Sequence, residues 1–226
     1  MRPPARPRGR PGRRGARAGL AVLLCALAAR APAATLVIHV LTDEGRALPG
    51  AVVTARPVEG PARHAPAVHA VMDQVNRAFE PDLLVVPVGS SVSFPNSDSV
   101  SHQIYSFSAA KRFQLPLYRG KPYPPVLFDQ PGIVTLGCNI HDQMLAYVLV
   151  TDAPYFGRTD EAGSWSAEVA HGRYRVTIWH PRLRDEAADL ERDLTVGDAD
   201  RAELTLRLAK PLRPAPLSDR PHSWEY

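Results

Sequence analysis

The stretch Gly137–Met144 (GCNIHDQM) decides how this 226-residue chain is interpreted, because it places a thiol, an imidazole and a thioether at the spacing C-x2-H-x2-M. The segment before it, Gly132–Leu136 (GIVTL), and the segment after it, Leu145–Thr151 (LAYVLVT), are rich in β-branched and aliphatic residues. Such runs predict strands. We therefore expect the motif in a loop that joins two strands, where three side chains can point at one centre.

The three side chains suit a soft metal ion. Cysteine with two histidines and a weak axial methionine is the ligand set of blue-copper electron-transfer sites. His102 is the candidate for the second histidine, since it follows a turn at Asn96–Asp98 and opens the alternating run His102–Phe107. The chain order then suits a site made by one distant strand and one loop. Zinc is the rival metal, although it rarely uses methionine.

Residues 1–33 are predicted to be a secretory signal peptide. An Arg/Pro/Gly-rich start precedes the apolar run Gly19–Ala29, which is shorter than the roughly 20 residues that span a membrane. Ala31–Ala33 (APA) supplies a small-x-small cleavage pattern. Cleavage would leave no transmembrane span and would remove Cys25. The exported, periplasmic chain would then keep Cys138 alone, with no possible internal disulfide.

The net charge of +4 belongs to this N-terminal segment. Eight of the 27 basic residues lie within residues 1–33 and none of the 23 acidic ones does, so the rest of the chain has 19 basic and 23 acidic residues and a charge of −4. We therefore expect no nucleic-acid partner. A hydrophobic content of 45% is that of a globular protein and excludes wholesale disorder.

Two segments resemble the cupredoxin family of plastocyanin- and amicyanin-like proteins. Asp82–His102 is similar to the family's V-x-F-x-N-x-D-x3-H segment, and Phe128–Val150 to its Pro-Gly, strand, C-x2-H-x2-M loop and closing strand. The resemblance spans Met72–Asp152. It implies one type 1 copper ion, with three equatorial ligands followed by an axial one: His102, Cys138, His141 and Met144.

Two positions depart from the family pattern. Gln103 stands where small blue copper proteins often have an asparagine that hydrogen-bonds the thiolate, and Asp142 stands where amicyanins have proline. Both changes leave the ligands intact. They alter the surroundings of the metal, and with them the expected reduction potential.

The flanking segments look like two parts of one further domain. Thr35–Val58 predicts two strands and Thr159–Leu208 predicts several more, and two strands alone are only marginally stable. Together they resemble a carboxypeptidase-regulatory-like (transthyretin-like) β-sandwich. The matching residues are Asp43, Gly45, Leu48, Gly50 and Ala51 in the first half, and Thr159, Asp160, Gly163, Gly172 and Tyr174 in the second.

We therefore expect an all-β protein, with a cupredoxin Greek-key β-sandwich inserted in a second, transthyretin/Ig-like β-sandwich. The expected divisions are a signal peptide at 1–33, the split sandwich at 34–62 and 155–210, the cupredoxin domain at 63–154 and an extended tail at 211–226. Three sequential pieces are the alternative. His64 and His69, in a Pro/Ala-rich linker, form with Met72 a candidate second copper cluster. The whole chain also resembles exported proteins called methylamine utilization proteins.

The function expected from these features is single-electron transfer in the periplasm through type 1 copper. A redox protein, either a c-type cytochrome or an exported dehydrogenase, would be the partner. We expect no enzymatic activity, because no Ser-His-Asp order, catalytic carboxylate pair or phosphate-binding glycine loop is evident. The alternatives are a module that delivers or buffers copper without electron transfer, and a β-sandwich that binds partners without metal.

Overall fold

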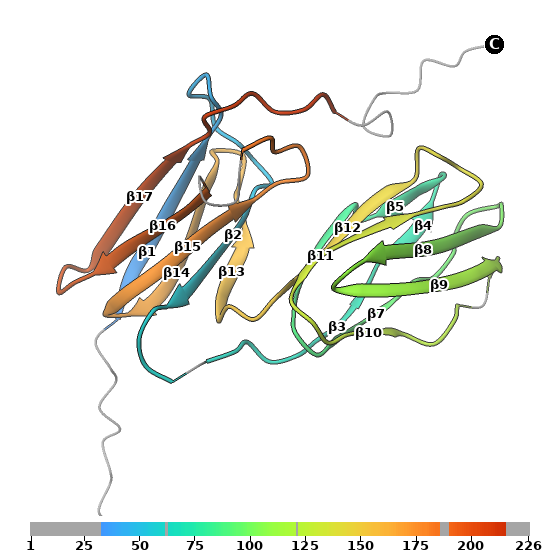
Figure 1. Cartoon of the computed structure of the whole chain (residues 1–226), viewed down its shortest axis with the longest axis horizontal. Helices are drawn as coiled ribbons and strands as arrows, with labels where there is room; N and C mark the ends of the chain where they lie inside the picture. Colours follow the sequence, from blue (N-terminus) through green and yellow to red (C-terminus); the bar gives the residue numbers. More distant parts are fainter. Residues whose placement is uncertain (1–32, 62, 121, 186–189, 216–226) are drawn as a thin grey trace, which may run out of the picture. The chain divides into compact units, whose positions relative to one another are not determined.

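The computed structural model describes residues 33–215 except 62, 121 and 186–189. The described chain is built from strands and loops (Figure 1), which confirms the predicted all-β class. The predicted signal peptide lies outside the described residues, apart from Ala33, which begins β1. Within the described part, no helix has the length and apolar character needed to cross a membrane.

The strands have the following bounds in chain order: β1 Ala33–Leu41, β2 Val52–Pro57, β3 His69–Val71, β4 Asp73–Val75, β5 Ala78–Glu80, β6 Leu83–Pro87, β7 Ser90–Ser93, β8 His102–Ser108, β9 Lys111–Tyr118, β10 Val126–Phe128, β11 Gly132–Gly137, β12 Leu145–Thr151, β13 Tyr155–Arg158, β14 Ser164–Ala170, β15 Gly172–Trp179, β16 Glu191–Val196 and β17 Arg201–Arg207.

Strands β3–β12, which we call the central domain, form a five-stranded sheet in the order β6-β12-β11-β8-β9, a three-stranded sheet in the order β10-β7-β3, and the hairpin β4-β5. Side chains of both larger sheets pack in one hydrophobic core. Ile104 and Leu136 come from the five-stranded sheet, and Val92 and Phe128 come from the three-stranded sheet. Alternate residues of each strand point into this core, because successive side chains of a strand face opposite ways. The central domain is therefore a two-sheet sandwich.

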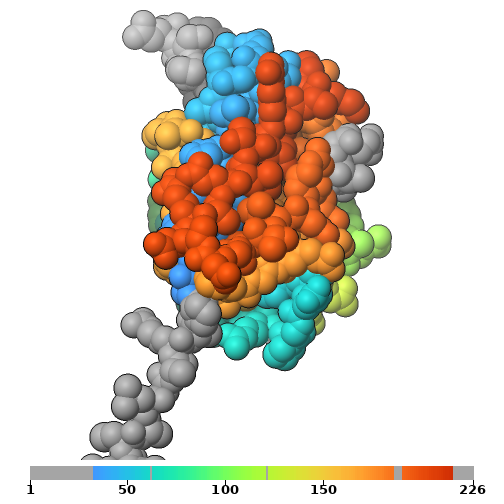
Figure 2. Space-filling view, turned by 90° about the vertical axis from the view of Figure 1, so that its left-hand side faces the viewer, coloured from blue at the N-terminus to red at the C-terminus, as the bar shows by residue number. Residues whose placement is uncertain are grey.

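Strands β1, β2 and β13–β17, which we call the flanking domain, form two sheets in the orders β14-β1-β17 and β13-β2-β15-β16. Every strand of the central domain lies between β2 and β13 in the chain. β1 contributes Leu36, Ile38 and Val40 to a core that also contains Val53 and Val176. In Figure 2 the orange-red surface of the C-terminal strands adjoins the blue surface of the first described residues, in accord with the parallel pairing of β1 and β17.

Some short elements were not expected from the sequence. The prediction that His69 lies in a linker is wrong. His69 begins β3, and β3 pairs in parallel with β7. A three-residue strand is too short to show an alternating pattern in the sequence. It forms because it pairs with a neighbouring strand. β9 was also missed, since it contains Pro116. Proline is tolerated there because β9 lies at the edge of its sheet.

Thr159 connects the two parts of the flanking domain. Its buried hydroxyl donates to the carbonyl of Leu48 (2.6 Å) and accepts from the backbone N–H of Ala51 (2.9 Å). The backbone N–H of Thr159 also donates to Ala51. These bonds join residues more than a hundred positions apart in the chain.

Replacing Thr159 with valine should lower the free energy of unfolding by about 2 kcal/mol, because the similar side chain leaves a buried carbonyl and a buried N–H without partners. Urea denaturation measures the change. The control is Thr35→Val, which removes an exposed hydroxyl bonded to Glu168 and should have a much smaller effect. Equal effects of the two substitutions would contradict this account of Thr159.

His180 follows the end of β15, and its Nδ1 accepts a hydrogen bond from the backbone N–H of Arg182 (3.2 Å). Burial, together with the charges of Arg182 and Arg158, lowers the pKa of His180 to about 4. The folded chain therefore holds a neutral imidazole at a pH where the unfolded chain is already protonated.

This difference predicts that the free energy of unfolding falls as the pH decreases from about 6.5 toward 4. His180→Gln keeps an acceptor for the N–H and should flatten this part of the profile. Urea denaturation at a series of pH values tests it, with exposed His64→Gln as the control. A His180→Gln profile as steep as the wild type would show that His180 is not responsible.

Candidate metal centre

The alternation of the strands positions the predicted ligands. In β8 the buried positions are His102, Ile104 and Ser106, so the imidazole of His102 lies on the inner face of the sheet. Cys138 directly follows β11 and continues the inward series of Val134 and Leu136. Because β8 and β11 are neighbours in the sheet, the imidazole and the thiol come from adjacent strands and face the same core.

The loop between β11 and β12 brings the second imidazole to the same place. The backbone N–H of Met144 donates to the carbonyl of His141 (3.0 Å), which closes a turn. Met144 is buried and belongs to the same hydrophobic core as Cys138. Cys138 and Met144 are 3% and 2% exposed, and His102 is fully buried. His141 is partly exposed, so one imidazole of the cluster reaches toward solvent.

Three donor atoms converge. The Nδ1 atoms of His102 and His141 are 3.1 Å apart, and Sγ of Cys138 is 3.9 Å from the first and 3.8 Å from the second. A point in the plane of these atoms lies about 2.1 Å from all three, close to the metal–nitrogen and metal–sulfur bond lengths of about 2.0–2.3 Å found for zinc. The geometry therefore fits one metal ion bound by these three atoms.

The chemistry of the donors favours copper over zinc. One thiolate and two imidazoles with a thioether nearby suit copper, whereas structural zinc sites have four thiolate or imidazole ligands. Burial lowers the pKa of His141, and the nearby His102 and Arg77 lower it further. The imidazole of His141 is therefore neutral near pH 7, and a metal-binding imidazole must be neutral.

Asp98 contacts the cluster, although its sequence context marks it only as a turn residue and as the aspartate of the D-x3-H pattern. Its Oδ2 lies 3.0 Å from Nε2 of His102, on the side of the ring away from Cys138. The hydrogen bond to His102 is the main cause that lowers the pKa of Asp98 to about 2, and backbone N–H groups add to it. The carboxylate is therefore ionised. The D-x3-H spacing was visible in the sequence, but a role for it required the tertiary contact.

Gly137 allows close packing beside the thiol. A Cβ atom on Gly137 would lie 2.8 Å from the ring of Tyr105, which is its cross-strand neighbour in β8. The ring of Tyr105 thus lies against the backbone next to Cys138. Gln103, the first departure from the family pattern, lies on this outer side of β8 and lines a small hollow with Tyr105 and Asn139.

The second candidate copper cluster is not assembled. His64 bonds through Nδ1 to the carbonyl of Asp152 (2.9 Å), whereas His69 bonds to the hydroxyls of Ser91 and Ser93. Met72 is fully buried in the core of the central domain. Among the cysteine, histidine and acidic side chains of the described residues, one group lies closely enough together to hold a metal ion. Its members are His102, Cys138 and His141.

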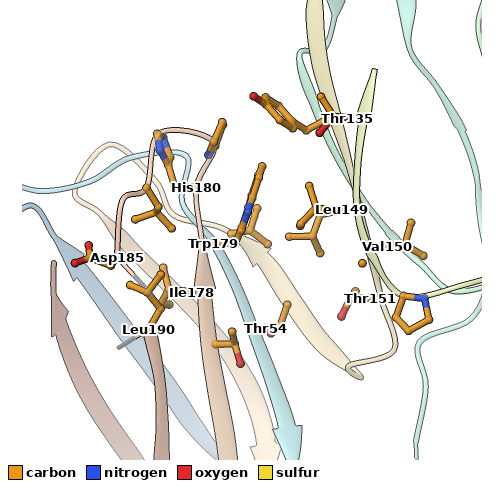
Figure 3. Close-up of a pocket in the computed structure, with 18 of the residues that line it drawn as sticks. Thr54, Thr135, Leu149, Val150, Thr151, Ile178, Trp179, His180, Asp185 and Leu190 are labelled. Carbon is orange, nitrogen blue, oxygen red and sulfur yellow. The ribbon is translucent and has the colours of Figure 1, made fainter. Parts of the chain in front are cut away.

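A cavity of about 640 Å³ lies apart from these residues (Figure 3). Its walls come from β2, β11, β12 and β15, and include Thr54, Leu149, Ile178 and Trp179. None of the four predicted ligands lines it. This cavity is therefore not part of the candidate metal centre.

Comparison with solved structures finds cupredoxins similar to this chain, as the sequence resemblance predicted. A purple cupredoxin from Nitrosopumilus maritimus is 25% identical, with 36% of this chain and 99% of that chain covered and a TM-score of 0.33. An amicyanin variant in its reduced state is 21% identical. The match covers 43% of this chain and 99% of the amicyanin, with a TM-score of 0.33.

A copper-containing nitrite reductase from Thermus scotoductus is 25% identical, with 42% of this chain covered and a TM-score of 0.35, and the match spans a quarter of that enzyme. Neither protein-family models nor curated proteins give a match. The resemblance of the flanking domain to carboxypeptidase-regulatory-like sandwiches stays a prediction.

Proposed function

We propose that this protein carries single electrons through one type 1 copper ion bound by His102, Cys138 and His141, with Met144 as the axial ligand. The observation that supports this most is the convergence of one sulfur and two imidazole nitrogens on a common point about 2.1 Å from each. A bound copper ion would supply a one-electron couple between a donor protein and an acceptor protein, and His102, Cys138 and His141 would hold it.

The residues around the cluster support this role. His102 and Cys138 are held by paired strands of a packed sandwich, so the ligand positions change little between oxidation states. The core excludes water from the thiol and the thioether, which are almost wholly buried. His141 is the partly exposed ligand, and its ring is the route by which an electron would reach a docked protein.

The partner and the compartment belong to the same proposal. The predicted signal peptide at residues 1–33 would direct the chain to the periplasm, where a c-type cytochrome or an exported dehydrogenase would exchange electrons with it. A copper-delivery module is the alternative function. Buried ligands on paired strands favour retention of the metal over its transfer.

Addition of Cu(II) to the purified protein should produce an intense visible absorption band from charge transfer between the Cys138 thiolate and copper. Cys138→Ser should abolish this band, since a hydroxyl cannot supply the transition. The control His69→Ala, which removes an imidazole outside the cluster, should keep it. A band that survives in Cys138→Ser would contradict the assignment, and a colourless complex with Cu(I) alone would favour copper delivery.

Met144→Gln should keep the copper but lower its reduction potential, because the axial ligand tunes the couple and an amide oxygen favours Cu(II). Voltammetry of the copper-loaded protein measures the shift. Met72→Leu is the matched control, since Met72 is a buried methionine of the same core and the substitution conserves volume. A potential that moves equally in both variants would show that Met144 is not an axial ligand.

A further inference from the structure

The two ring nitrogens of His102 have different surroundings. Nδ1 faces the cluster, 3.1 Å from Nδ1 of His141 and 3.9 Å from Sγ of Cys138, whereas Nε2 lies 3.0 Å from Oδ2 of Asp98. A carboxylate can only accept a hydrogen bond, so the ring must donate Nε2–H to it. In a neutral imidazole the other nitrogen then carries the free lone pair. That nitrogen is Nδ1, the atom aimed at Cys138.

Asp98 is itself held in place by backbone groups. The N–H of Arg77 donates to Oδ2 (2.7 Å), and the N–H of Ser99 donates to Oδ1 (2.7 Å). The N–H of Asp98 donates to the side chain of Asn96 (3.0 Å), a residue that is 5% exposed. Asp98 therefore has a fixed position relative to His102.

The hairpin β4-β5 supplies part of this support. Its turn residues Asn76 and Arg77 have positive φ angles of 51° and 60°, the conformation of a two-residue type I′ hairpin turn. This conformation directs the N–H of Arg77 at Asp98. The base of the hairpin is joined to the same loop, because Asp73 accepts hydrogen bonds from the N–H and the hydroxyl of Ser97. A separate element of the fold thus holds the carboxylate against the metal cluster.

We propose that Asp98 is a positioning residue of the metal centre, which holds His102 as the Nε2–H tautomer, presents its Nδ1 lone pair to the metal, and through its negative charge favours the oxidised state of a bound copper. The effect on copper rests on the proposed function. The effect on the tautomer does not, because it concerns this chain without metal.

The negative charge of Asp98 should shift the reduction potential of a bound copper in a direction that follows from general chemistry. A carboxylate bonded to the far nitrogen of a metal-binding imidazole makes that imidazole a stronger electron donor, and loss of such a partner typically weakens metal binding about 10- to 100-fold. Cu(II) gains more than Cu(I) from an electron-rich ligand and a nearby negative charge. Asp98 should therefore lower the reduction potential of the centre.

The first test uses the metal-free wild-type protein. Nitrogen-15 NMR of the histidine rings at neutral pH should show His102 protonated at Nε2 and not at Nδ1. Protonation at Nδ1 would overturn the proposal. This measurement needs no variant and no copper, so it stands even if substitution at Asp98 prevents folding or if the protein does not bind copper.

The second test is the reduction potential of copper-loaded Asp98→Asn, which keeps the size of the side chain and removes its charge. We expect Cu(II) affinity to fall about 10- to 100-fold, with a rise in potential of about 59 mV for each tenfold loss relative to Cu(I). Asp129→Asn is the charge control, since Asp129 is paired with Lys111. Asp129→Asn should leave the potential near that of the wild type.

The outcomes separate the two proposals. A blue wild-type protein whose potential is unchanged in Asp98→Asn, or rises equally in Asp129→Asn, would overturn the role of Asp98 and leave the copper site intact. A wild-type protein that binds no Cu(II) but shows the Nε2–H tautomer would contradict the proposed function, while the positioning role of Asp98 would hold.

Discussion

The candidate metal centre depends on the alternation of side chains along three neighbouring strands. β8, β11 and β12 lie next to one another in one sheet, and each has its inward-facing series ending at a donor side chain: His102, Cys138 and Met144. A shift of register by one residue would turn a whole series to the opposite face. The core of the central domain and the metal cluster are therefore fixed by the same pairing, and neither can change without the other.

The candidate cluster is linked by hydrogen bonds to a part of the central domain that supplies none of the predicted ligands. The 640 Å³ cavity is separate from the cluster, because none of the four predicted ligands lines it. The hydrogen bonds of His102 pass outward through Asp98 to the β4-β5 hairpin. The β4-β5 hairpin therefore helps to hold the Asp98 carboxylate beside the predicted ligand His102, although the hairpin itself supplies no ligand.

The sequence predicted the parts of the site that follow from local spacing. Cys138, His141 and Met144 lie within seven positions of one another, and His102 could be added because a turn and an alternating run mark the beginning of its strand. The role of Asp98 could not be predicted, since its support comes from Arg77 and Asp73 across a hairpin of three-residue strands. Such strands are too short for any periodicity, and they form because tertiary contacts stabilise them.

The most direct test is a crystal structure of the copper-loaded protein with diffraction data measured on both sides of the copper absorption edge. The account predicts one anomalous peak in the central domain, about 2.1 Å from Sγ of Cys138 and from Nδ1 of His102 and of His141. A copper peak bound elsewhere, or one that lacks Cys138 among its ligands, would contradict the central claim.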